Sequence, residues 1–141
     1  MNTRILIGTV VGGLLNSIFG GLIFGLVLMS MIQEHSVPYV GLMKLEPDML
    51  LLTLSNVFWG LLTSIVFVKW AKVYSFKKGM MVNMMISIPI SIAVDLQFMS
   101  FMNIYKDFTV LFLDIIGVGV MTAIVGGLLG WIFGKMGVLP E

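Results

Sequence analysis

The chain has no cysteine and only one histidine among its 141 residues. The missing cysteines exclude disulfides, thiolate metal sites and cysteine nucleophiles. The single histidine, His35, lies in a polar interval, where we expect it to be simply solvated, and it leaves no legible serine–histidine–aspartate set. No HExxH, phosphate-binding glycine loop or redox-cofactor motif is present. We therefore expect neither an enzyme nor a cofactor.

Charge is also scarce, because charged residues make up only 11% of the chain. Eight basic and seven acidic residues nearly cancel, so nucleic acid is not an implied partner. Hydrophobic residues account for 59%, and the mean hydropathy is +1.09. A soluble domain of this size does not need so much apolar surface. The chain is therefore expected to lie in a lipid bilayer.

Apolar segments of membrane-spanning length set the predicted architecture. They run over about 5–32, 49–68, 80–102 and 108–133, with an interfacial loop at 33–48 and a short basic loop at 74–79. This pattern predicts one all-α domain over 1–141, a polytopic transmembrane four-helix bundle. Six of the eight basic residues fall on the side of the termini, namely Arg4, Lys69, Lys72, Lys77, Lys78 and Lys135. Because short cytoplasmic loops hold the excess of such residues, both termini are expected to be cytoplasmic, in a bacterial inner membrane.

Two acidic residues, Asp95 and Asp114, lie inside the third and fourth apolar segments. The polar break at 103–107 is midway between them, so in antiparallel helices both carboxyls lie at one depth, roughly 10–12 Å from the turn. An ionisable group at that depth is costly and is by default a functional-site hypothesis. If the two carboxyls meet, they cannot both ionise cheaply, so they could share a proton or exchange it for a cation.

Polar residues recur every four positions in the third segment, at Asn83, Ser87, Ser91 and Asp95. This stripe must face inward to avoid lipid, which places Asp95 inside the bundle. In the second segment, Asn56 falls at about the same depth. The candidate polar or ion site therefore consists of Asp95, Asp114, Asn56 and Ser91. It is compatible with a binding, transport or ion-handling module, or with an accessory or structural subunit whose polar groups only fix helix register.

Small residues also recur every four positions in the first and fourth segments, where they permit close helix approach. The helix-packing candidates are Gly12, Gly13, Gly20, Gly126, Gly130 and Gly134. They could pack within the chain or against a second copy, so we expect a homodimer or a partner membrane subunit. The 11–20 and 125–134 stretches share the pattern Val-Gly-Gly-Leu-Leu-x-x-Ile-Phe-Gly. Independent use of the same small-residue packing pattern explains this better than an inherited repeat.

The thirteen methionines are better explained by general apolarity than by copper, because the pairs Met80/Met84 and Met81/Met85 cover two helix faces. We therefore expect no metal site.

Several short stretches carry a resemblance to known proteins. They are the glycine-rich first segment, the 43–49 stretch with Lys44, Glu46, Pro47 and Asp48, Trp70-Ala71, Lys77-Lys78-Gly79 and the closing 123–127 stretch. Taken together, the chain resembles small four-helix membrane proteins of unknown function found in bacteria, especially Bacteroidetes-like genomes. The resemblance implies the fold and the membrane location, and it implies no activity.

Overall fold

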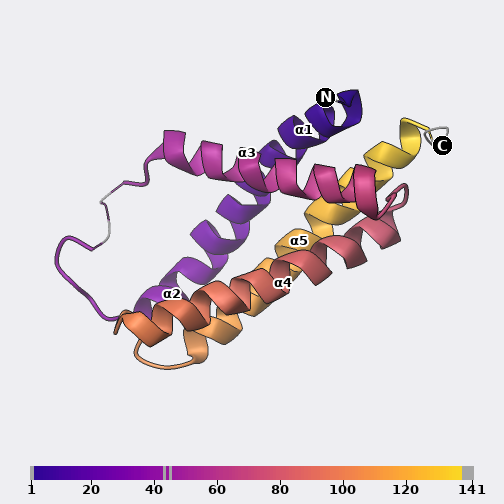
Figure 1. The fold of residues 1–141 in the computed structure, drawn as a ribbon. Coiled ribbons are helices and arrows are strands. Elements are labelled where there is room, and N and C mark those ends of the chain that lie inside the picture. Colours follow the sequence, from indigo (N-terminus) through magenta and orange to yellow (C-terminus); the bar gives the residue numbers. More distant parts are fainter. Residues whose placement is uncertain (1, 43, 45, 138–141) are drawn as a thin grey trace.

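The computed structural model describes residues 2–42, 44 and 46–137, and these form four antiparallel helical rods (Figure 1). The described residues contain no strand. The first rod is α1 (Thr3–Gly20), which continues through the π-helical stretch η1 (Gly21–Leu28) into α2 (Met29–Glu34). The others are α3 (Met49–Ile65) with its π-helical end η2 (Val66–Trp70), α4 (Phe76–Phe101) and α5 (Thr109–Lys135).

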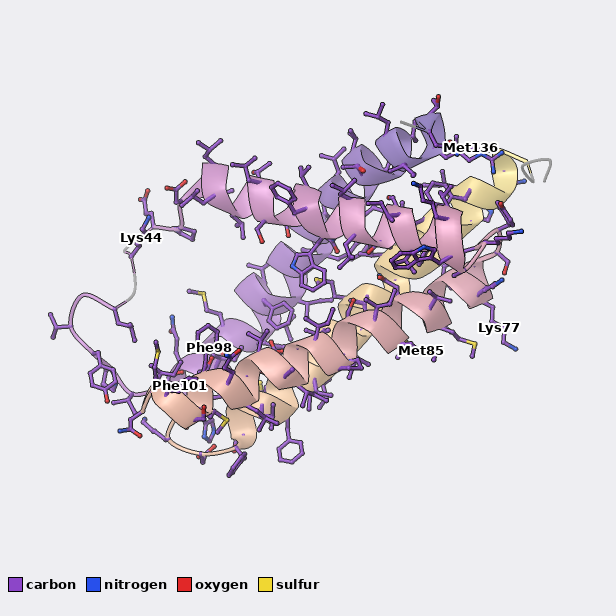
Figure 2. The ribbon with its side chains drawn as sticks, viewed as in Figure 1. Lys44, Lys77, Met85, Phe98, Phe101 and Met136 are labelled. Carbon is purple, nitrogen blue, oxygen red and sulfur yellow. The ribbon has the colours of Figure 1, made fainter. Side chains whose placement is uncertain are left out.

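All four rods are long and apolar enough to cross a membrane. They contain 32, 22, 26 and 27 residues, whereas a span needs about 20. The predicted all-α bundle of four spans is thus confirmed, and the chain is an integral membrane protein. Both termini lie at one end, called here the termini end, together with Lys77 and Met136 (Figure 2). The 35–42 and 102–108 stretches lie at the other end, called here the loop end.

Capping side chains fix where the helices begin. The Asp48 carboxylate accepts hydrogen bonds from the backbone N–H groups of Leu50 and Leu51, both at 3.1 Å, as expected for an N-cap. Ser75 caps α4 in the same way by accepting from Lys78 N. The predicted basic loop at 74–79 is therefore wrong beyond Ser75, because this cap starts the helix at Phe76.

Glycines join the helices into two close pairs, α1 with α3 and α4 with α5. A Cβ added at Gly12 would lie 3.0 Å from the Cα of Gly60, and one at Gly130 would lie 3.0 Å from the Cα of Gly79. The other candidate glycines also pack against residues of this chain. An added Cβ would meet Val57 at Gly13, Asn83 and Gly79 at Gly126, Tyr74 at Gly134 and, more loosely, Met121 at Gly20. These glycines therefore serve packing inside the monomer.

The hydrophobic core sits at the termini end. Its buried members are Ile5, Phe67, Val68, Val73, Val125, Leu129 and Phe133. The rings of Phe67 and Phe133 meet edge to face with centroids 6.3 Å apart. From this core, α3 and α4 diverge toward the loop end, while α1 crosses over to α5 through η1 and α2 (Figure 1). The two helix pairs are thus packed together at the termini end and separate toward the loop end.

Candidate functional site

A cavity of about 260 Å³ lies between the two helix pairs. All four polar residues of the α4 stripe line it, namely Asn83, Ser87, Ser91 and Asp95. At 3.6 residues per turn these positions follow one face of the helix, and successive members are about 6 Å apart along the axis. The stripe therefore forms one polar wall of the cavity, as its need to avoid lipid predicts.

The two carboxyls predicted to be level lie next to each other in this cavity. Asp95 and Asp114 both line it, and they are near enough for their charges to affect each other. Ser91 Oγ donates a hydrogen bond to Asp114 Oδ2. Oxygen Oδ2 of Asp95 is buried and has no hydrogen-bond partner among the described residues. The structure thus brings together three of the four candidate site residues.

Asn56, the fourth candidate, does not belong to the cavity. Its Nδ2 donates to Ser17 Oγ of α1 at 3.0 Å, inside the α1–α3 interface. The stripe of Asn56, Gly60 and Ser64 on α3 faces the glycines of α1, since only small residues admit that close approach. Depth alone suggested Asn56, and the rotation of α3 excludes it.

The floor of the cavity is a hydrogen-bonded network that the sequence pattern revealed only in part. Thr63 Oγ1 donates to Asn83 Oδ1 at 3.1 Å, and Asn83 Nδ2 donates to the carbonyl oxygen of Thr122 at 3.0 Å. All three residues are buried. The network ties α3, α4 and α5 together where the cavity meets the core, so these polar groups have a structural role.

Two other buried polar residues line the cavity without any such partner. Asn16 on α1 is 7% exposed and Ser87 on α4 is 6% exposed. Neither side chain makes a hydrogen bond to any residue that the structure describes. Their polar atoms are not among the unpaired atoms that are sealed from solvent, so they open into the cavity. Asn16 lies four residues from both Gly12 and Gly20, which is also the spacing of a packing residue, so the sequence alone does not reveal its position in the cavity.

The two asparagines of the α1–α3 pair should respond differently to truncation. Asn56→Ala removes a made hydrogen bond and is expected to lower the free energy of unfolding by about 0.6–2 kcal/mol. Asn16→Ala removes an unpaired group and should leave stability unchanged or raise it. Thermal unfolding in one detergent compares the two variants. Equal losses would show that Asn16 has a structural partner after all.

A short strap, formed by residues 35–39 and 103–107, joins the end of α2 to the α4–α5 turn at the loop end. Ser36 and Tyr105 form an antiparallel bridge, flanked by hydrogen bonds from Val37 N to Ile104 O and from Lys106 N to His35 O, at 2.9 and 2.8 Å. Burial, and then the nearby charges of Asp95 and Asp114, raise the pKa of Tyr105 above its ordinary value. Tyr105 is therefore the strap residue whose hydroxyl lies near enough to the carboxyl pair to be affected by its charge.

His35 is not simply solvated, as its loop position predicts, but belongs to this strap. Its Nδ1 lies 3.0 Å from Asp107 Oδ2. Hydrogen bonds from Thr109, and then from His35, lower the pKa of Asp107 from 3.8 to about 2. The two residues are 72 positions apart, so neighbouring sequence gives no sign of the pairing.

The lowered pKa of Asp107 predicts a pH-dependent contribution to stability. A depressed carboxyl pKa stabilises the fold above its unfolded value near 3.9, and this stabilisation disappears as pH falls toward about 2. We expect Asp107→Asn to lower the melting temperature at pH 7 and to converge with the parent at the acidic limit. Parallel melting curves from pH 7 to pH 2 would contradict this role.

Comparison of the chain with protein-family models, curated proteins and solved structures found no match in any of the three. Among the described residues, no group of three or more His, Asp or Glu side chains is arranged to hold a metal ion.

Proposed function

We propose that the protein is a membrane-embedded cation-binding module of the binding and transport class, built around Asp95 and Asp114. The observation that carries this proposal is the cavity itself, which both carboxyls line and no described basic residue lines. Acidic groups within spans are costly, and they characteristically mark ion or substrate paths. A purely structural pair would be expected to have a cationic or fully hydrogen-bonded partner.

The packing of the helices supports passage of a ligand as well as its binding. The α1–α3 and α4–α5 pairs are each held by close glycine contacts, and the core joins them at the termini end. Toward the loop end the pairs separate (Figure 1), and we propose that a ligand enters the cavity there. Rocking of one rigid pair against the other is a recurring way to expose such a site alternately.

The distribution of basic residues and the resemblance to bacterial proteins support an orientation with both termini cytoplasmic in a bacterial inner membrane. In this orientation the strap and the open end of the cavity face outward. Single cysteines at Ser36 and Ser75 should then be labelled from opposite sides of the membrane, and labelling of both from one side would contradict it.

A thermal-shift panel tests the cation site directly. A ligand that binds only the folded protein raises its melting temperature. Purified protein is melted in chloride salts of alkali metals, alkaline-earth metals and alkylammonium ions at constant ionic strength. At least one cation should stabilise the parent, and the same cation should have no effect on the Asp95→Asn/Asp114→Asn variant. A panel without any such difference would overturn the proposal.

The alternative is an accessory or structural subunit, acting as a homodimer or beside a partner subunit. One surface favours it: a Cβ added at Gly21 or Gly25 of η1 would meet no described atom within 4 Å. Under this alternative, Gly25→Leu should reduce the mass of the detergent-solubilised particle, and Asp95→Asn should be tolerated because an amide keeps the shape of the carboxyl. Loss of cation response in the Asp95→Asn variant would exclude a purely structural role.

A further inference from the structure

The carboxyl pair gives the cavity a negative end that nothing in the described chain neutralises. Asp95 and Asp114 line its loop-end half, and Asp95 Oδ2 is buried and unpartnered. The polar groups of Asn83, Thr63 and Thr122 satisfy one another at the opposite end. A positively charged group of a ligand is therefore expected to bind beside the two carboxyls.

Asn16 and Ser87 supply a second and independent sign of a ligand. Both side chains are more than nine-tenths buried, line the cavity and have no hydrogen-bond partner among the described residues. Their oxygens are acceptors that an N–H group would satisfy. Because they come from α1 and α4, they lie on two different walls, and one ligand between the pairs can reach both.

The remaining walls are unsuited to a hydrated inorganic ion. They are formed largely by apolar and aromatic side chains, namely Trp59, Ile90, Val94, Val118 and Met121. Calcium or magnesium takes six or more oxygen ligands or retains its waters. A cation with a hydrocarbon body instead buries that body against such walls, and the face of a tryptophan attracts cations. A volume of about 260 Å³ is also far larger than the roughly 30 Å³ of one water.

We infer that the cavity binds an organic ammonium ion, a protonated primary or secondary amine with an apolar body. The inference rests on the proposed function, since it names the class of cation for the same site. The ammonium group lies at Asp95 and Asp114, where its N–H groups donate to the carboxylates, and the body lies along Trp59 and the aliphatic wall. Asn16 and Ser87 accept hydrogen bonds from a polar group of the ligand.

A fluorescence titration on Trp59 tests this assignment. The other two tryptophans, Trp70 and Trp131, are exposed near the termini end and are replaced by phenylalanine. The full chain in detergent is titrated with 2-phenylethylamine hydrochloride, with sodium chloride, and with 2-phenylethanol, which has the same body without the charge. We expect a saturable signal for the amine and at least about tenfold weaker binding of the alcohol and of sodium.

Variants complete the test. Asp114→Asn should abolish the amine signal. Because 2-phenylethylamine has no polar group besides its ammonium, Asn16→Ala and Ser87→Ala should leave its binding unchanged, and each should weaken binding of tyramine, whose phenol can donate to them, by about fivefold, the effect of one hydrogen bond. Asp48→Asn makes the same charge change at a helix cap outside the cavity and should bind as the parent does. If the double phenylalanine variant does not fold, the melting temperature of the parent with the same compounds replaces the fluorescence signal.

The outcomes separate the two proposals. Equal binding of amine and alcohol, or a sodium response without an amine response, overturns the organic ammonium assignment. In the second case, loss of the sodium response in Asp95→Asn/Asp114→Asn leaves the cation site in place. Absence of a carboxyl-dependent response to any cation overturns both.

Discussion

Replacement of both Asp95 and Asp114 by asparagine is expected to abolish cation binding while the four helices stay folded. Both residues line the cavity, and Ser91 already donates to Asp114, so an amide oxygen at that position can accept the same bond. The substitution removes negative charge without removing volume. Loss of a charged partner typically costs about 2–5 kcal/mol, so affinity should fall by about 30-fold or more.

The matched control is Asp48→Asn, which makes the same change of charge outside the cavity. Asp48→Asn retains a good helix cap, because asparagine caps as well as aspartate does. Binding and melting temperature are measured on the parent, this control and the double variant. Cation affinity that survives the double replacement would show that the carboxyls only set helix register.

Gly79→Val is expected to disrupt the fold. A Cβ at Gly79 would overlap the carbonyl group of Gly126 and lie 3.0 Å from the Cα of Gly130. These neighbours are backbone atoms, so no side chain can move aside and α4 must separate from α5. We expect a loss of at least about 3 kcal/mol in the free energy of unfolding, at the upper end of typical overpacking costs.

A matched glycine provides the control for this prediction. Gly25→Val introduces the same side chain in η1, where an added Cβ meets no described atom within 4 Å. Its melting temperature in detergent should stay close to that of the parent, whereas Gly79→Val should yield little folded protein. Similar behaviour of the two variants would mean that the close α4–α5 contact is not needed for the fold.

The fold and the depth of the carboxyls were predictable because hydrophobic length and residue counting determine them. Asp95 and Asp114 are equally far from one turn, and antiparallel helices make such positions level. The α4 stripe also revealed its own rotation, because four polar residues on one face must avoid lipid. Rotation of α3 was not predictable, since Asn56 and Thr63 are both plausible inward residues and only packing against the α1 glycines decides between them.

Contacts between residues far apart in the chain could not be predicted from the sequence pattern. The pairing of His35 with Asp107 depends on how two loops meet at the loop end, and neither loop has a regular period. The position of Asn16 was hidden for a different reason. Its four-residue spacing with Gly12 and Gly20 is the same for a packing residue and for a cavity residue, so only its missing partner distinguishes the two.

The most direct test of the central claim uses the absence of cysteine in the chain. Ser87→Cys places one thiol in the cavity, and Ser64→Cys places one in the α1–α3 interface, where Ser64 is fully buried. Each is reacted with a cationic aminoethyl thiosulfonate and an anionic sulfonatoethyl thiosulfonate, with rates normalised to a free thiol. A carboxyl-lined, open cavity predicts that position 87 reacts at least about tenfold faster with the cationic reagent, that Asp95→Asn/Asp114→Asn removes this preference, and that position 64 stays inert. Equal rates for the two reagents, or a thiol at position 87 as inert as that at position 64, would contradict a cation site.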